Sequence, residues 1–113
     1  MPYISLSVSV PISEHKKHVL QQQIGSLITI IPGKTPEGTM IKIEDCCDIF
    51  MGGAPAKAAF CEIRLLGSAP VQNKAELYEK IYNLLTDQLD IEKLYFNYSV
   101  FEEWGSGDTF RTL

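Results

Sequence analysis

The strongest constraint on the fold is an order of elements, strand–helix–strand, that occurs twice along the chain. In the first copy, residues 3–10 alternate between apolar and polar side chains, as a strand with one buried face does. Ser13 is suited to cap a helix, and a stripe of Leu and Ile at helical spacing then runs to Ile31, just before Pro32. Because residues 40–44 alternate again, the first half of the chain predicts a strand, a helix and a strand.

The second half repeats this order without residue-level identity to the first. Residues 58–66 alternate as a strand does, and Asn73 followed by Glu76 resembles the capping box that begins many helices. A broad apolar face at helical spacing extends to Leu89, and residues 94–101 alternate once more. Two β-α-β units of this length predict an α+β fold, in which a four-stranded mixed sheet carries both helices on one face.

The segment that joins the two units has a weaker pattern. Residues 45–57 contain Gly52, Gly53 and Pro55, which are typical of turns and loops. Residues 49–51 are the candidate for a short strand within it. We therefore expect a loop here rather than a further layer of the fold.

The sheet face that the helices leave uncovered is predicted to carry several large apolar side chains together. Contiguous apolar surface of this kind usually marks an association surface, so we infer an oligomer that packs through this face. The tail, residues 102–113, has Trp104 and Phe110 on either side of two glycines and is expected to reach a neighbouring subunit. The residues predicted on the uncovered face are Ser5, Ser7, Ser9, Met40, Phe60, Leu66, Tyr95, Asn97 and Phe101.

Length and composition exclude several classes of protein. The chain has 113 residues, the size of one domain, and we expect residues 1–113 to fold as a single unit. Its net charge of −4 comes without a basic cluster, so no nucleic-acid partner is expected, and an anionic substrate would need a local cation. No apolar run approaches the roughly 20 residues that span a bilayer, and the N-terminus has no secretory signal, so no membrane partner is expected.

Three cysteines, Cys46, Cys47 and Cys61, bear on redox chemistry and metal binding. Their odd number and the adjacent pair do not predict a disulfide framework, and a reducing, cytoplasmic location suits them best. C-x-x-C spacing is missing and His15 and His18 are distant in the sequence, so no metal site is expected. Cys46 and Cys47 are expected to be buried or half-buried thiols without a special role.

Pro2 is the residue with the most unusual chemistry. An initiator Met that precedes proline is generally removed, which would leave Pro2 as a free secondary amine at the start of a strand. The reference pKa of an α-amino group is about 7.7–8.0, and burial against apolar walls or a nearby Lys would lower it. Such an amine could be neutral near pH 7 and act as a base. Taken alone, however, Met1-Pro2 is a common start of a chain and carries little weight.

A series of short motifs runs along the whole chain and adds to the weight of Pro2. In their order and nearly ungapped spacing they resemble the macrophage migration inhibitory factor family of the tautomerase superfamily; each motif alone is weak, whereas the ordered set is fairly specific. The motifs are Met1-Pro2 before an alternating strand, Gly33-Lys34-x-Pro36, Phe50-Met51-Gly52-Gly53, Leu66-Gly67, Leu94-Tyr95-Phe96-Asn97-Tyr98 and Gly107-Asp108-Thr109-Phe110.

The resemblance implies an assembly and a catalytic pair. The family forms homotrimers whose sheets line a central barrel, and its active sites lie between adjacent subunits. Pro2 matches the family's general base, which removes a proton from the carbon next to a carbonyl and returns it elsewhere. Lys34 matches the lysine that holds the substrate carboxylate and helps to lower the pKa of the proline.

The resemblance also implies a set of substrate contacts. Leu66 replaces an isoleucine whose backbone contacts the substrate and whose side chain forms an apolar wall. Tyr95 and Asn97 match residues that the neighbouring subunit contributes to the far, aromatic end of the pocket, and Phe110 matches a phenylalanine near its mouth. Apart from the resemblance, Arg64, two residues before Leu66, is a candidate second carboxylate contact that would suit a dicarboxylate or longer substrate. An exposed strand cation is an alternative of at least equal weight.

The sequence departs from the family pattern at several positions. Ala58 stands where the best-known member has the first cysteine of a C-x-x-C pair, and Cys61 aligns with the second, so no thiol–disulfide activity is expected. Gly38 falls where an aromatic residue is common, which predicts a more open pocket. Trp104 aligns loosely with the family's late tryptophan, because its spacing to Phe110 differs by one residue.

Together these features predict a keto–enol tautomerase that acts on phenylpyruvate-like 2-keto acids, with no cofactor. Enolisation needs a base near the operating pH and a cation for the carboxylate, which Pro2 and Lys34 could supply. The alternative is a trimeric binding or signalling protein with little or no turnover, and a third interpretation is an interaction module whose resemblance is accidental. If Met1 stays attached, the nitrogen of Pro2 is an amide and cannot act as a base.

Overall fold

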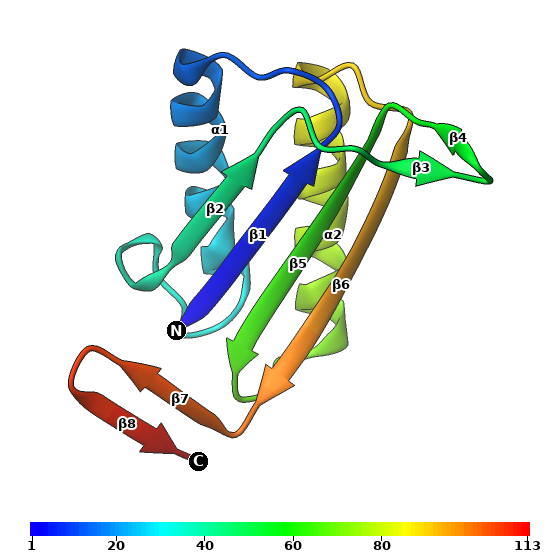
Figure 1. The fold of residues 1–113 in the computed structure, drawn as a ribbon. Coiled ribbons are helices and arrows are strands. Elements are labelled where there is room, and N and C mark those ends of the chain that lie inside the picture. Colours follow the sequence, from blue (N-terminus) through cyan, green and yellow to red (C-terminus); the bar gives the residue numbers. More distant parts are fainter.

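A computed structural model describes residues 1–113, and its centre is a four-stranded sheet with the strand order β2-β1-β5-β6 (Figure 1). The strands are β1 (Pro2–Val8), β2 (Met40–Glu44), β5 (Ala58–Leu66) and β6 (Lys93–Phe101). β1 pairs in parallel with β2 and antiparallel with β5, and β5 pairs in parallel with β6. The predicted mixed sheet and α+β fold are confirmed.

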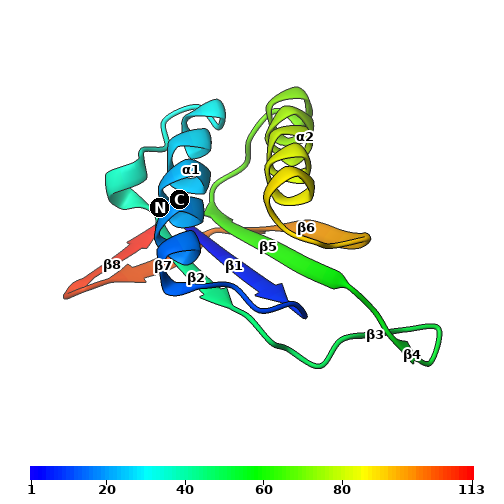
Figure 2. The same cartoon turned by 90° about the horizontal axis from the view of Figure 1, so that it is seen from above.

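Both helices lie on one face of the sheet, as Figure 2 shows. α1 spans Glu14–Leu27 and α2 spans Val71–Gln88. The hydroxyl of Ser13 accepts a hydrogen bond from the backbone N–H of Lys16 at 3.1 Å, which confirms the predicted cap of α1. Neither helix combines the length and apolarity that crossing a membrane requires.

The space between the helices and the sheet is filled by aliphatic side chains. Alternate residues of β1 and β5 face the helices, and one stripe of each helix faces the strands, so both periodicities end in the same core. Removing this apolar surface from water is the main favourable term in folding. The core residues with no exposed surface are Ile4, Leu6, Val8, Leu20, Ile24, Ile28, Cys61, Ile63, Leu65, Leu77, Ile81 and Leu85.

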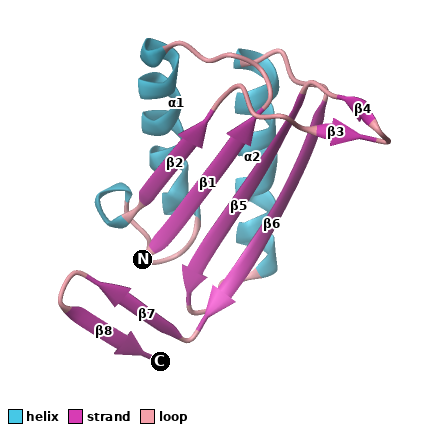
Figure 3. Cartoon of the chain, viewed as in Figure 1, coloured by secondary structure: helices cyan, strands magenta, loops and turns pink.

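Two small hairpins extend from the sheet at opposite ends (Figures 1 and 3). Strands β3 (Phe50–Met51) and β4 (Ala54–Pro55) form the first, where a short strand was expected at 49–51. Strands β7 (Glu103–Ser106) and β8 (Thr109–Thr112) form the second, which the sequence analysis did not predict. Its four-residue strands are too short to give a clear periodic signal.

Several element ends differ from the prediction. β1 ends at Val8 rather than at residue 10, and the backbone N–H groups of Cys46 and Cys47 donate to the carbonyls of Val10 and Val8. α1 ends at Leu27 and continues as a 3-10 turn, η1 (Ile28–Ile30). This type of helix has about three residues per turn, so Ile28 and Ile31 lie on the same side and both are buried.

The predicted capping box of the second helix is wrong. α2 begins at Val71, with Pro70 at the N-cap position and no side-chain cap. Asn73 lies inside the first turn, and its Nδ2 donates a hydrogen bond to the carbonyl of Ile30 at 2.9 Å. This side chain therefore satisfies a carbonyl group at the end of η1 rather than an N–H group at the start of its own helix.

The sheet face away from the helices, called the open face below, carries the predicted residues with one exception. The register places Ser5, Ser7 and Phe60 on it, as expected from the alternation. Ser9 lies beyond the end of β1, where its hydroxyl donates to the carbonyl of Ala56 at 2.7 Å and accepts from the N–H of Ala58 at 2.8 Å. Ser9 thus closes a loop instead of lining the open face.

The middle of the open face is polar, which the sequence analysis did not predict. Lys42, Ser5, Glu62 and Asn97 lie level with one another across the four strands and are called the polar row. Exposed apolar side chains lie on both sides of this row, near the two ends of the sheet. They are Phe60 and Tyr95 toward the end of β1 at Val8, and Met40 and Phe101 toward the end at Pro2.

Candidate active site

Pro2 is held at the start of β1, at the end of the sheet that faces the β7–β8 hairpin (Figure 1). It is buried and pairs with Leu65 of β5, while Met1 before it is half-buried. Proline is tolerated at the first residue of a strand, because the missing N–H costs no ladder hydrogen bond there. The terminus is therefore fixed by the sheet, as the sequence predicts.

Lys34 reaches the same end of the sheet from the loop after α1. Gly33 has a φ of 80°, which turns the chain after Pro32, and the N–H of Lys34 donates to the carbonyl of Ile31 at 3.1 Å. The ammonium of Lys34 then donates to the carbonyl of Leu66 at 3.1 Å. The fold thus brings together Pro2, Lys34 and Leu66, which lie far apart in the sequence.

The electrostatic effect of this arrangement is visible at the terminal amino group. The pKa of the Met1 amino group is lowered from 8.0 to about 6, mainly by burial and then by the neighbouring Lys34 and the charge of Arg111. Each of these causes disfavours the charged form of an amine. A terminal nitrogen in these surroundings is therefore largely neutral at pH 7.

A cavity of about 660 Å³ opens between this end of the sheet and the β7–β8 hairpin. Its volume is within the range of about 300–1,000 Å³ that is usual for small-molecule sites. Gly38, at the end of the 3-10 turn η2 (Pro36–Gly38), lines it without a side chain. The other lining residues are Met1, Pro2, Tyr3, Met40, Arg64, Phe101 and residues 103–107.

Arg64 lies on the open face of β5 and lines this cavity. Its guanidinium carbon is 5.8 Å from the centre of the Tyr3 ring, the residue directly opposite on β1. A cation over an aromatic face at this distance is attracted to it. The ring therefore holds the guanidinium at the wall of the cavity rather than leaving it free in solvent.

The two aromatic residues of the tail lie on opposite faces of the β7–β8 hairpin. Trp104 pairs with Arg111, and Phe110 pairs with Gly105, so the alternation of each strand separates them. Trp104 lines the cavity, whereas Phe110 is 67% exposed and does not. The role expected for Phe110 at a pocket mouth stays a prediction, because it would need a second copy of the chain.

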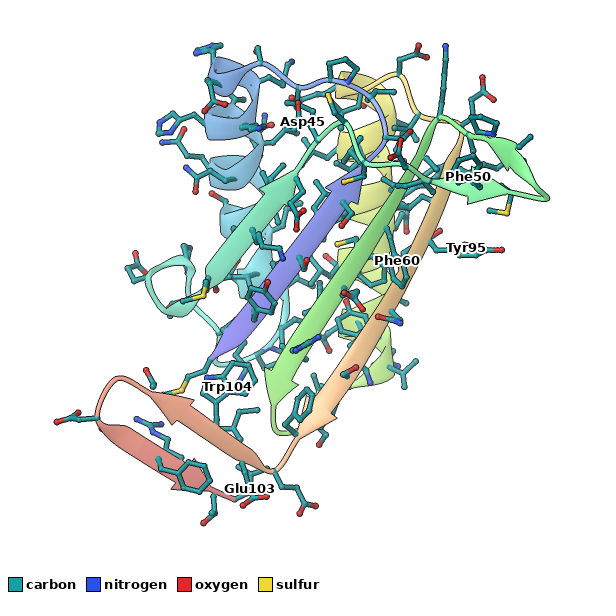
Figure 4. All side chains as sticks on the ribbon, viewed as in Figure 1. Asp45, Phe50, Phe60, Tyr95, Glu103 and Trp104 are labelled. Carbon is teal, nitrogen blue, oxygen red and sulfur yellow. The ribbon has the colours of Figure 1, made fainter.

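Tyr95 and Asn97 do not approach Pro2 within one chain. Pro2 is level with Leu65, and Leu65 is level with Val100 on β6. At about 3.3 Å per residue, Tyr95 lies about 17 Å from that level along the strand, and Asn97 about 10 Å. Figure 4 shows Tyr95 near the far end of β6 from Trp104. A single chain therefore holds only one part of the predicted site.

Two charged residues near the cavity were missed by the sequence analysis. Glu103 lines it at the start of β7, and Arg111 acts on the terminal amino group from β8. Both belong to the tail, for which no strand was predicted. An Arg two residues before the C-terminal Leu113 carried no signal, because only the hairpin folds the tail back toward the N-terminus.

The cysteines form no disulfide and lie in different environments. Cys61 is buried, and burial raises its pKa to about 12. Cys47 is half-buried, but Cys46 is exposed, so the expectation of burial is wrong for Cys46. Cys46 has a φ of 55° and lies in the turn after β2, where a tight bend turns its side chain outward. Ala58, at the position of the missing cysteine, is buried.

Comparison with solved structures shows the same fold in several proteins. MIF2 of Leishmania major is 23% identical over 97% of both chains, with a TM-score of 0.87. A macrophage migration inhibitory factor-like protein of Entamoeba histolytica is 20% identical over 96% of this chain and 97% of that one, with a TM-score of 0.84. A homologue from Prochlorococcus marinus is 18% identical over 96% and 98%, with a TM-score of 0.83.

Sequence comparison assigns the family. No curated protein sequence matches this chain. The family model described as macrophage migration inhibitory factor (MIF) matches residues 1–110, which is nearly the whole chain and includes every motif quoted above. This protein therefore belongs to the macrophage migration inhibitory factor family.

Proposed function

We propose that the protein is a keto–enol tautomerase of phenylpyruvate-like 2-keto acids, with Pro2 as its general base and acid. The observation that carries this proposal is the lowered pKa of the Met1 amino group beside Lys34. Its pKa of about 6 leaves this amino group neutral at pH 7. A base with a pKa near the operating pH is present in its unprotonated form and still has enough proton affinity to take the proton. Removal of Met1 would place the nitrogen of Pro2, one residue further in, in the same buried surroundings.

The chemistry needs only groups that the chain supplies. The neutral nitrogen of Pro2 would take a proton from the carbon next to the keto group, and the electron pair would move onto the carbonyl oxygen. Lys34 would hold the substrate carboxylate and stabilise the developing negative charge. The protonated Pro2 would then return the proton to oxygen, and the reverse sequence would give the keto form.

We further propose that the active unit is a homotrimer in which a neighbouring subunit supplies Tyr95 and Asn97. Tyr95 is 64% exposed and, like Asn97, lies too far from Pro2 in its own chain. The outer strands β2 and β6 also leave one edge each without a strand partner, and natural proteins seldom leave such edges open. A second copy that covers an edge and the open face would answer both observations.

The experiment follows the loss of the hydrogens on carbon 3 of phenylpyruvate in D₂O by proton NMR. Protein with Met1 removed, verified by intact mass, should catalyse the exchange, and Pro2→Gly should slow it at least 100-fold. Pro55→Gly, on the distant β4, is the matched control and should leave the rate unchanged. Equal rates for wild type and Pro2→Gly would exclude the prolyl base.

The alternative of a binding or signalling protein has its own observation. Gly38 lines the cavity without a side chain, so a substrate there would be less enclosed than beside a large side chain. Fully processed trimer without turnover on any of several 2-keto acids would favour this alternative. A monomer in solution would argue against both functions.

A further inference from the structure

Arg64 lines the cavity, Lys34 and Arg111 lie near the Met1 amino group at its wall, and none of these three cations has an acidic partner. The ion pairs of the structure involve Lys17, Lys42 and Lys57, and none involves Lys34, Arg64 or Arg111. In a chain of net charge −4, this leaves positive charge gathered where the overall field is negative. Such a local excess is what an anionic ligand would neutralise.

Arg64 forms no ion pair, although the acidic Glu62 lies two residues before it on the same face of β5. Its neighbours across the strands are Tyr3 on β1 and Ser99 on β6, and neither is acidic. The Tyr3 ring lies against the guanidinium at 5.8 Å and leaves its N–H groups free to bind an anion. Arginine is suited to this task, because its planar fork can donate two parallel hydrogen bonds to one carboxylate.

The positions of Arg64 and Lys34 fit the two ends of one small molecule. The Lys34 ammonium is bound to the carbonyl of Leu66, which lies two residues beyond Arg64 on β5, about 7 Å along the strand. An extended chain of four C–C bonds separates its end carbons by about 5 Å. The two lengths are similar, which makes a five-carbon diacid the ligand to test between Lys34 and Arg64.

Glu103 is the acidic residue that lines the cavity, and its placement does not cancel this charge. It pairs with Thr112 across the β7–β8 hairpin, and alternation places its side chain on the face opposite Trp104. Figure 4 shows Glu103 at the base of the hairpin, where β7 begins, and on the other side of β7 from Trp104. Arg111, opposite Trp104, shares the face that is turned to the cavity.

We propose that the site prefers 2-keto dicarboxylates, with Lys34 binding the carboxylate beside the keto group and Arg64 binding the distal carboxylate. The inference rests on the proposed tautomerase function and places 2-keto dicarboxylates ahead of phenylpyruvate-like acids among its substrates. The step is unchanged: the proton on carbon 3 moves to Pro2 and the electron pair to the carbonyl oxygen, with no oxidant or reductant. Arg64 contributes by binding the substrate, not by moving the proton.

The experiment compares two acids that differ only in the distal group. 2-Oxoglutarate ends in a carboxylate and 2-oxopentanoate in a methyl group, and exchange of the hydrogens on carbon 3 in D₂O measures proton abstraction from both. Processed wild type should show a kcat/KM at least 10-fold higher for 2-oxoglutarate. Arg64→Gln should lower that value about 30-fold and the value for 2-oxopentanoate less than 3-fold, and Arg64→Lys should restore part of the loss.

Lys42→Gln is the matched control, because Lys42 is also a cation on the open face but is paired with Glu44 at 2.8 Å. This substitution should leave kcat/KM for both substrates unchanged. Equal losses on both acids in Arg64→Gln, or no preference in wild type, would overturn the proposal.

Failure of the proposed function has a different signature. Wild type would then exchange the hydrogens of neither acid. Calorimetric titration would show whether the site still binds the distal carboxylate. At least 10-fold tighter binding of 2-oxoglutarate than of 2-oxopentanoate, abolished in Arg64→Gln, would support the dicarboxylate subsite without turnover. Equal or undetectable binding of both acids would refute it.

Discussion

The two ends of the central sheet differ in whether their charged side chains form ion pairs. At the end of β1 near Val8, Lys17 pairs with Asp45 at 3.0 Å, and Lys57 pairs with Asp90 at 2.7 Å. At the end near Pro2, the Lys34 ammonium has only a carbonyl oxygen as its partner. Paired charges at the first end hold loops together, whereas unpaired charges at the second end remain available to a ligand.

Asp45 shows what the paired end gains. Besides Lys17, its carboxylate accepts a hydrogen bond from the N–H of Ile12 at 2.8 Å, and so joins the turn after β2 to the loop before α1. This is a structural role, satisfied within the chain. Lys occurs at both ends of the sheet, so only the surroundings of each Lys in space distinguish the two roles.

The largest expected effect tests the unpaired end directly. Lys34→Ala should lower kcat/KM for 2-keto acids by about 10²–10³, the usual range for a lost electrostatic contact to a transition state. The urea midpoint should change little, because Lys34 holds no acidic partner. Lys57→Ala, at the paired end, is the control and should leave kcat/KM unchanged. A comparable loss of activity in both variants would erase the contrast between the ends.

The next effect concerns the proton affinity of the terminus. In protein that retains Met1, the amino group should titrate near pH 6 by NMR, so it is neutral above that value and charged below. Lys34→Ala and Arg111→Gln should each raise this pKa, because each removes a positive charge. It should stay below 8.0 in both, since burial remains the main cause. A wild-type value near 8 would contradict the description of this end.

The smallest effect tests the paired end through acid stability. The pKa of Asp45 is lowered to about 2, below its usual 3.8, mainly by the hydrogen bond from the Ile12 N–H and then by Lys17. A carboxyl group whose pKa is lower in the folded than in the unfolded state stabilises the fold at pH values above its unfolded pKa. This stabilisation is lost as the pH falls toward 2. Urea unfolding at pH 5, 3 and 2 should show this loss in wild type and a smaller one in Asp45→Asn. Parallel pH profiles would mean that Asp45 is not a stabilising contact.

Periodicity predicted most of the fold, because the core depends on it directly. The alternation of residues 58–66 gave the bounds of β5, and the helical stripes placed both helices on one face. The capping box at Asn73 failed because a longer-range contact, to the carbonyl of Ile30, outweighed the local signal. The β7–β8 hairpin failed because strands of four residues give no reliable period.

The candidate site was less predictable than the fold. Pro2 was unusual in its chemistry but gained its weight as a candidate from the resemblance to a family, and Lys34 emerged from that resemblance alone. Arg111 could not be predicted, because its closeness to the terminus depends on a hairpin that the sequence did not reveal. The proposed roles of Tyr95 and Asn97 would need a neighbouring subunit, and the pattern of one chain contains no information on contacts between chains.

The polar row on the open face has a consequence for any assembly of this chain. Copies that meet through this face would gain most from burying the aromatic and methionine side chains at its two ends. The hydroxyl, carboxylate, ammonium and amide groups between them are costly to dehydrate, so water would stay enclosed with them. Such an assembly would be cohesive at its rims and wet inside, with a hydrated lumen instead of a dry interior.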